Sequence, residues 1–348
     1  MPDLLPHEPP RTTDEPPVAE RIGPEPEDFI VNELPLYSPS GDGEHWMFEL
    51  RKRGWTTPDA VSALARAARV AERDIGHAGM KDRHAVTTQW MTIPGRAASP
   101  DSWELPDGLH IVSHSRHSTK IRTGHLAGNR FEIRLVNAAP DGVRRAQAIL
   151  DGILERGLPN YFGVQRFGHE GRNLEEGLRW LAAGAPARGK RTRFYRKLYP
   201  SVVQAEIFNR YVTARRARGL DRLLRGEVVR LDGSRSVFVV EDPEAELPRL
   251  QSRDIHLTGP MPGPKMRAAA GEALRLEHDA LTELGLEADS VKTLERLVDG
   301  TRRDLLVWPE RLEVTSNEPG TLLITVSLPP GAYATQLLRE LLPAPWFS

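Results

Sequence analysis

The chain changes character twice along its length, and this pattern constrains its fold more than any other feature. Alternating apolar and polar residues predict a strand at 44–52 in the amino-terminal part, and 109–117 is a further strand candidate. From about Gly157 to Asp304, long amphipathic helical segments alternate with short strands, and strand patterning returns in 312–315 and 322–328. Strand-rich ends around a helical middle predict an α+β fold in which both ends complete one sheet and a second domain is inserted.

The domain boundaries follow from these changes in pattern. Residues 1–26 carry eight prolines and many acids, so we expect them to stay disordered or extended, with order beginning near Glu27. Residues 27–156 together with 305–348 are expected to form one domain, which we take to be the catalytic one. Residues 157–304 are expected to form the inserted domain.

Local signals place the other expected elements. Strands are expected at 27–34, 85–93 and 130–136, the last with Phe131, Ile133 and Leu135 on one face. Thr57 as N-cap and Pro58 as the first helical residue would start a helix that covers 61–70. Further helices are expected at 141–156, ending at Gly157, and at 331–341.

Composition removes several classes of function. The chain has no cysteine, which excludes disulfides, thiolate zinc sites and a cysteine nucleophile. It has no Walker lysine motif, no dinucleotide-binding glycine motif and no serine nucleophile elbow. No apolar run approaches a membrane span and no signal peptide is visible, so a cytoplasmic protein is expected. His110 and His114 share a strand face but His117 lies on the other, so no metal site is expected.

The net charge of −1 hides a segregated distribution. Residues 1–50 hold twelve acids against Arg11 and Arg21, whereas residues 188–225 hold twelve Lys or Arg against two acids. A second basic stretch runs from Arg116 to Arg134. Such clusters would attract a polyanion such as RNA, although arginines that pair with carboxylates or coat a solvated face would give the same pattern.

Residues 79–89, Gly-Met-Lys-Asp-Arg-His-Ala-Val-Thr-Thr-Gln, place a short carboxylate, Asp82, between two cations. Neighbouring cations favour the charged form of a carboxylate, and an ionised aspartate can act as nucleophile or base. Taken alone, the segment is equally typical of a solvated turn.

Two aromatic segments can be interpreted in two ways. Asn160–Gly168 combines aromatics, glycines and an arginine, and Gly128–Phe131 places an amide beside an aromatic ring. The rings could be buried in the core or at a domain junction. Alternatively, they could stack on unpaired nucleotides while Asn129 reads a polar base edge.

Taken together, 79–89, 128–131, 160–168 and the carboxy-terminal 328–335 resemble the TruD family, the tRNA pseudouridine synthases D. Pro26-Glu27-Asp28-Phe29 is similar to the family's amino-terminal motif, and the likeness runs from about Pro26 to Leu342. The resemblance implies a catalytic pseudouridine synthase domain with a mixed, largely antiparallel sheet and an inserted α/β TRUD domain. It also implies a cofactor-free isomerisation of one tRNA uridine, typically at position 13 in the D arm.

The resemblance also implies roles for individual residues. Asp82 matches the catalytic aspartate, Asn129 and Phe131 match residues associated with the target nucleotide, and Tyr333 matches an aromatic near the active site. We add Phe29, Lys81 and Arg83 to the substrate-binding residues. The residues expected to contact the RNA backbone are Lys120, Arg122, Lys190, Arg191, Arg193 and Lys197. The family often has a lysine where this chain has Gly23, so Arg21 would have to replace that amine or the contact is absent.

The expected partner is therefore tRNA, bound by a monomer without a small-molecule cofactor. Two other functions fit the same surfaces. A non-catalytic RNA-binding protein or tRNA chaperone would bind tRNA without forming product. A glycosidase-like hydrolase acting on nucleosides would need a second catalytic carboxylate, and none is evident.

Overall fold

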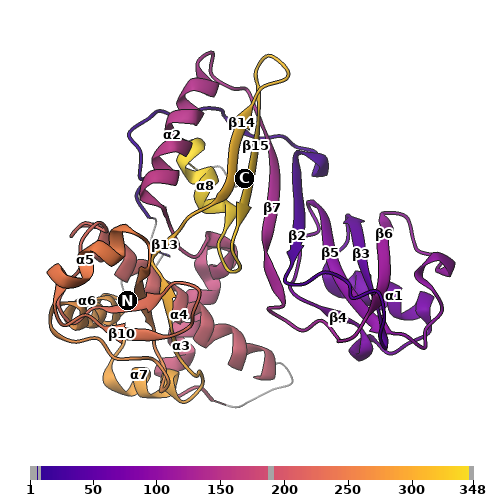
Figure 1. Cartoon of the computed structure of the whole chain (residues 1–348). Helices are drawn as coiled ribbons and strands as arrows, with labels where there is room; N and C mark the ends of the chain where they lie inside the picture. Colours follow the sequence, from indigo (N-terminus) through magenta and orange to yellow (C-terminus); the bar gives the residue numbers. More distant parts are fainter. Residues whose placement is uncertain (1–5, 7–8, 187–191, 345–348) are drawn as a thin grey trace. The chain divides into compact units, whose positions relative to one another are not determined.

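The computed structural model describes residues 6, 9–186 and 192–344, which form two compact units (Figure 1). Residues 13–155 with the described part of 308–348 make up the first, here called the sheet unit. The described residues of 1–12 and 156–307 make up the second, the helical unit. None of the described helices is both long and apolar enough to cross a membrane.

The sheet unit is built on a nine-stranded sheet with the main order β14-β15-β7-β2-β5-β3-β6. Its strands are β1 (Arg21–Ile22), β2 (Phe29–Pro35), β3 (His45–Arg53), β4 (Gly76–His77), β5 (Val86–Pro94), β6 (Leu109–His117), β7 (Leu126–Val136), β14 (Glu310–Thr315) and β15 (Thr321–Leu328). β2 and β5 run parallel and the other described pairs are antiparallel. The predicted α+β class with a mixed, largely antiparallel sheet is confirmed.

The strand register gathers polar and aromatic residues on one face of this sheet. Glu33 of β2 lies opposite Asn129 of β7, and Val31 lies opposite Phe131. Val31 is also level with Thr87 of β5, which pairs with Lys52 of β3. Because paired residues project to the same side, Glu33, Asn129, Phe131 and Lys52 share a face.

Helix α1 (Thr57–Ala68) covers part of that face. Its Ala60 and Leu64 are fully buried against Phe48, Leu50 and Met91 of the sheet, and burial of a leucine contributes about 2 kcal/mol. The N-cap is Thr56, whose hydroxyl accepts from the Asp59 amide, so the expected Thr57 cap is wrong by one residue. Because Thr56 is the cap, the Thr57 hydroxyl can form other hydrogen bonds.

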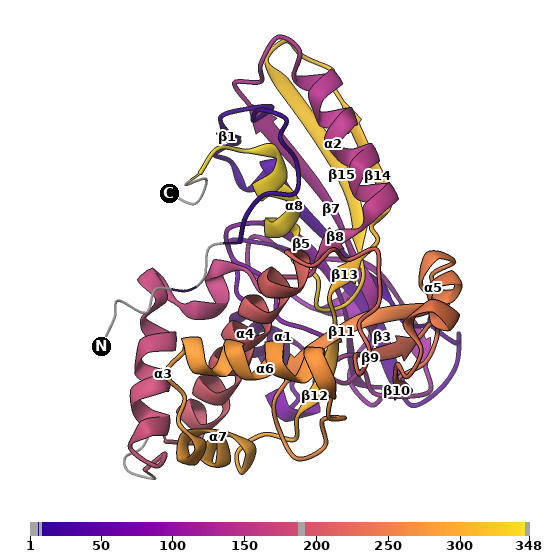
Figure 2. The same ribbon diagram turned by 90° about the vertical axis from the view of Figure 1, so that its left-hand side faces the viewer.

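Helices α2 (Gly142–Arg156) and α8 (Ala334–Leu341) lie beside β14 and β15, as two views show (Figures 1 and 2). Both are amphipathic, and each buries an apolar stripe, Ile149 and Leu150 in α2 and Leu337 and Leu338 in α8. α2 ends as expected before Gly157, which has a φ of +81°. α8 begins at Ala334, three residues later than expected.

The amino-terminal segment corrects a prediction. Residues 1–26 were expected not to pack, yet Val18 is fully buried and its amide donates to the Leu341 carbonyl at 2.8 Å. β1 pairs with the end of β7, on the same side of β7 as β2. Proline-rich composition restricts the backbone to extended conformations, and an extended segment is suited to adding a strand.

The helical unit contains a four-stranded sheet of order β10-β9-β11-β12 and a two-stranded pair, β8 with β13. Its elements are β8 (Leu158–Pro159), α3 (Arg172–Ala182), α4 (Thr192–Arg216), β9 (Val228–Leu231), β10 (Val237–Val239), α5 (Pro243–Gln251), β11 (Ile255–Met261), α6 (Gly271–Glu283), α7 (Ala288–Glu295), β12 (Thr301–Asp304) and β13 (Leu306–Val307). Arg215 and Glu227 form a fully buried ion pair at 2.7 Å at the end of α4.

Candidate active site

Asp82 lies on the loop between β4 and β5 with its side chain exposed. Its Oδ1 accepts a hydrogen bond from the His84 amide at 3.0 Å, which closes a local turn. The carboxylate is thus held in one orientation while it remains accessible.

The loop backbone is attached to the buried end of α1. The Thr57 hydroxyl accepts from the Lys81 amide at 2.9 Å and donates to Gln89 Oε1 at 3.0 Å. Gln89 Nε2 in turn donates to the Gly79 carbonyl at 3.5 Å. Thr57 and Gln89 are both fully buried, so this end of the motif is fixed from inside the sheet unit.

Lys52 supports the same loop from below. Its Nζ donates to the carbonyls of Trp55 at 2.7 Å, Asp82 at 2.8 Å and Lys81 at 3.3 Å. The side chain is almost completely buried, and burial lowers its pKa to about 8, an effect that the Asp82 charge opposes and the Lys81 charge reinforces. A buried ammonium therefore lies directly beneath the Asp82 backbone.

Lys81 points into the sheet unit. Its Nζ lies 2.9 Å from Glu33 Oε2, and it also donates to Asn129 Oδ1. Glu33 uses its other oxygen to accept from the Trp90 amide at 3.2 Å. Lys81 therefore does not take part in the expected clamp of two cations around the Asp82 carboxylate. A buried carboxylate attracts the ammonium more strongly than an exposed one.

Phe131 and Phe29 form an edge-to-face pair with ring centroids 6.1 Å apart. Phe131 is 8% exposed and Phe29 is half-buried. Most of the Phe131 side chain therefore lies in the core, as the first of the two interpretations predicted. Beside them, a Cβ at Gly128 would lie 2.5 Å from the Leu328 carbonyl oxygen, which explains the glycine before Asn129.

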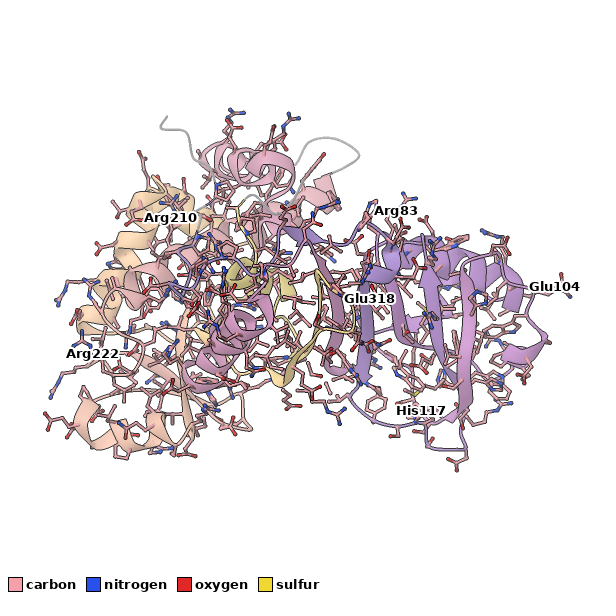
Figure 3. All side chains as sticks on the ribbon, turned by 90° about the horizontal axis from the view of Figure 1, so that it is seen from above. Arg83, Glu104, His117, Arg210, Arg222 and Glu318 are labelled. Carbon is pink, nitrogen blue, oxygen red and sulfur yellow. The ribbon has the colours of Figure 1, made fainter. Side chains whose placement is uncertain are left out.

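Of the remaining two residues expected near substrate, Tyr333 is partly buried and Arg83 is exposed. Tyr333 is the N-cap residue of α8, five residues after Leu328, which pairs with Asn129. Arg83 is exposed and lies at the periphery of the ribbon in Figure 3.

The basic stretch from Arg116 to Arg134 is largely used within the protein. Arg116 stacks on Trp46 at 3.9 Å, Lys120 donates to the Arg73 carbonyl, and Arg134 pairs with Asp28 and Glu318. Arg130 contacts Glu132 at 3.5 Å. Arg122 is exposed and has no ion pair within the part of the chain that the structure describes. Arg130 and Arg134 thus pair with carboxylates, whereas Arg116 and Lys120 contact an aromatic ring and a backbone carbonyl.

In the second basic stretch, Lys190 and Arg191 lie outside the described residues, and Arg193 belongs to α4 without a described side chain. Lys197 is exposed on α4. Phe194, one turn earlier, is 62% exposed. Further along α4, Arg210 and Arg215 pair with Glu206 and Glu227.

The aromatic rings of the segment 160–168 are buried in the helical unit. Tyr161 and Phe167 are 1% exposed, and the backbone of Phe162 exchanges two hydrogen bonds with the Asn209 amide, at 2.8 and 3.0 Å. The structural interpretation of these rings is therefore the one observed, and nucleotide stacking by them is not available.

The structure also explains the glycine at the position of the family's lysine. A Cβ at Gly23 would lie 2.1 Å from Asp28 Oδ2, so no side chain fits there without moving Asp28. Arg21 pairs with Val136, seven residues along β7 from Asn129, a separation of roughly 24 Å. Arg21 therefore does not replace an amine at this site.

Sequence reasoning missed the residues beneath the loop, namely Lys52, Glu33, Thr57 and Gln89. Each looks like an ordinary strand or helix residue, and only the register shows that they meet. One signal was available, since Lys52 and Glu33 stand at positions where strand alternation predicts an inward side chain. Among the described residues, no group of three or more His, Asp or Glu side chains forms a metal site.

Comparison with known proteins gives the same family as the motifs. The family model for tRNA pseudouridine synthase D (TruD) matches residues 9–176 and 191–341. A tRNA pseudouridine synthase D of Anaeromyxobacter sp. (strain Fw109-5) is 43% identical over 325 residues, covering 92% of this chain and 91% of the relative. One of Thermus thermophilus is 37% identical over 333 residues, covering 95% of this chain and 91% of the relative.

A crystal structure from Methanosarcina mazei, whose description names tRNA pseudouridine synthase D, has the same fold. It superposes with a TM-score of 0.73 at 25% identity, covering 96% of this chain and 95% of that one. On the family match and these identities, the chain belongs to the TruD family of tRNA pseudouridine synthases D.

Proposed function

We propose that this tRNA pseudouridine synthase isomerises the uridine at position 13 in the D arm of tRNA, and that the Asp82 carboxylate starts the reaction. The sheet unit is the catalytic domain and the helical unit is the inserted TRUD domain. The enzyme works as a cytoplasmic monomer without a cofactor.

One observation supports this proposal more than any other. The Asp82 carboxylate is exposed, while the backbone that carries it is held by Lys52 and Thr57 from inside the domain. Lys81, the preceding residue, reaches Asn129 on the strand that also carries Phe131. A loop held from inside the domain thus carries an anion next in sequence to a lysine that contacts Asn129, and an anion, an amide and an aromatic ring are groups that a uridine site can use.

The reaction breaks the N1–C1′ bond, turns the uracil, joins C5 to C1′, and moves the C5 proton to solvent while N1 gains one. An ionised carboxylate has two ways to start it. It can attack C1′ and form a glycosyl ester, or remove the 2′ proton and give a glycal. Both return Asp82 to its original state, so the residue is regenerated in each turnover.

Asn129 and Phe131 hold the detached base. An ammonium has only donors, so the Asn129 atom that faces Lys81 must be its oxygen, and the NH2 group remains to donate to a uracil carbonyl. Phe131, braced by Phe29, supplies an aromatic surface for the ring, and Tyr333 at the start of α8 is a second aromatic residue of the same unit. Both contacts retain uracil until the new bond forms.

The exposed cations Arg83, Arg122 and Lys197 contact the RNA backbone. Lys120, Lys190, Arg191 and Arg193 extend these contacts. Extrusion of the target uridine costs a few kcal/mol, and phosphate contacts that release counterions offset this cost.

The test uses two tRNA transcripts that differ only in having U or C at position 13. The purified enzyme should convert U13 to pseudouridine and release tritium from C5-labelled U13, and the C13 transcript should yield no product. Pseudouridine at another site on both transcripts would contradict position 13 as the target. Binding without product would favour the chaperone, and free uracil would favour the hydrolase.

A further inference from the structure

Lys52 is a buried cation whose three hydrogen-bond acceptors are all backbone carbonyls. It lies on β3 at 1% exposure, and its Nζ donates to Trp55 at 2.7 Å, Asp82 at 2.8 Å and Lys81 at 3.3 Å. Two of these three carbonyls belong to the loop that carries the proposed catalytic carboxylate. The third, Trp55, belongs to the turn that leads into α1.

The number of acceptors matches the chemistry of an ammonium group. A protonated lysine has three donors and no acceptor, so three carbonyls satisfy it completely. A neutral amine has two N–H groups and a lone pair, so it would leave one of the carbonyls unbonded or facing that lone pair. The geometry of the Lys81–Asp82 peptide therefore depends on the proton that Lys52 carries.

We propose that Lys52 is a positioning residue for catalysis: its ammonium fixes the Lys81–Asp82 backbone so that the Asp82 carboxylate is held in its reactive orientation. This inference depends on the proposed role of Asp82. The charged groups that act on Lys52 are Asp82, which favours the ammonium, and Lys81, which disfavours it. Since burial lowers the pKa of Lys52 to about 8, the ammonium is lost just above neutral pH.

The first experiment compares kcat and KM for Lys52→Met and Arg51→Met on the U13 transcript. Arg51 is the matched control, because it is the preceding residue on the same strand and is exposed. A displacement of about 1 Å at the reacting group lowers the rate about 100-fold, so Lys52→Met should lose about that factor in kcat with KM within about threefold. Arg51→Met should keep kcat within about threefold of wild type.

The second experiment restores the ammonium and uses the absence of cysteine from the chain. Lys52→Cys is unfolded, alkylated with 2-bromoethylamine at its single thiol and refolded, which replaces one methylene of the lysine side chain by sulfur. The product should recover at least about tenfold in kcat over the untreated variant. Because the sulfur lowers the pKa of the amine, the alkaline fall in kcat, expected near pH 8 in wild type, should move to lower pH.

These readouts separate the two proposals. If Asp82→Asn is inactive but folded Lys52→Met keeps wild-type kcat, the positioning role is wrong and the role of Asp82 stands. If Lys52→Met does not fold, the pH profile decides, and an alkaline limb at the same pH in wild type and the alkylated protein would overturn the inference. If Asp82→Asn is fully active, the proposed function itself fails.

Discussion

The ammonium of Lys81 lies 2.9 Å from the carboxylate of Glu33, and both side chains are almost fully buried beneath the loop that carries Asp82. Lys81 therefore acts toward the interior, where it pairs with Glu33 and orients Asn129, although its neighbour in sequence faces solvent. One residue thus connects the loop that carries Asp82, β2 and β7.

Replacement of Glu33 by glutamine should destabilise the sheet unit strongly. The change keeps the shape but removes the charge and leaves the Lys81 ammonium buried beside an amide, which costs about 3 kcal/mol or more. Urea unfolding followed by circular dichroism measures the loss. Glu27→Gln is the control, since its pair with Arg53 is half-exposed and its removal should change the midpoint little. Equal midpoints for the two variants would contradict the burial argument.

Asn129→Asp separates the two functions of the Asn129 side chain. A carboxylate keeps an acceptor for Lys81 but has no NH2 group to donate to uracil. We expect kcat/KM on the U13 transcript to fall roughly 10- to 100-fold, the effect of one lost hydrogen bond in a buried site. The unfolding midpoint should fall as well, because the new carboxylate shares the Lys81 ammonium with that of Glu33. Wild-type kcat/KM in folded Asn129→Asp would show that the amide donor is not used.

Phe131→Leu and Phe131→Tyr test the aromatic surface. Both keep a large apolar side chain at an almost buried position, so both should fold. Loss of stacking on one base lowers affinity or rate about 10- to 100-fold, so the leucine variant should lose that factor and the tyrosine variant should not. Free uracil, measured by chromatography, should increase only with leucine. Equal kcat values for the two would contradict a stacking role.

As Lys52 loses its proton with rising pH, its contribution to the free energy of unfolding should rise, whereas kcat should fall. Its pKa is lowered from 10.5 to about 8 on folding, so between these values the unfolded chain binds one proton more than the folded chain. The free energy of unfolding of wild type, measured relative to Lys52→Met, should therefore rise with pH from about 8 to 10.5. Denaturant titrations at four pH values in this window test this. A relative stability that falls with pH would contradict a buried, easily deprotonated Lys52.

The sequence was sufficient for the fold class and for most element positions. The strand expected at 109–117 is observed at Leu109–His117, and the strand predicted at 44–52, where alternation is a local signal, is observed at His45–Arg53. Errors arose where a neighbour in space decides the outcome. Val18 packs against α8, which lies more than 300 residues away in sequence, and Thr56 rather than Thr57 caps α1.

For the site, the motif around Asp82 identified the loop but not its supports. Lys52 and Glu33 act through strand register, which joins the strands β3, β5, β2 and β7 between residues 29 and 136. The charge pattern of 116–134 was misleading, because the sequence does not show which arginines bond to other groups of the protein. Arg116 and Arg134 look like parts of a basic surface in sequence, but in the structure they bond to Gly95 and to Asp28 and Glu318.

The central claim is that the Asp82 carboxylate starts the isomerisation, and pseudouridine mapping on the U13 transcript with purified Asp82→Asn tests it most directly. Asp42→Asn, at another exposed loop aspartate of the same unit, is the control. We predict that Asp82→Asn folds, binds the transcript and forms no pseudouridine, while Asp42→Asn converts U13 as wild type does. Pseudouridine at U13 formed by Asp82→Asn at the wild-type rate would contradict the account.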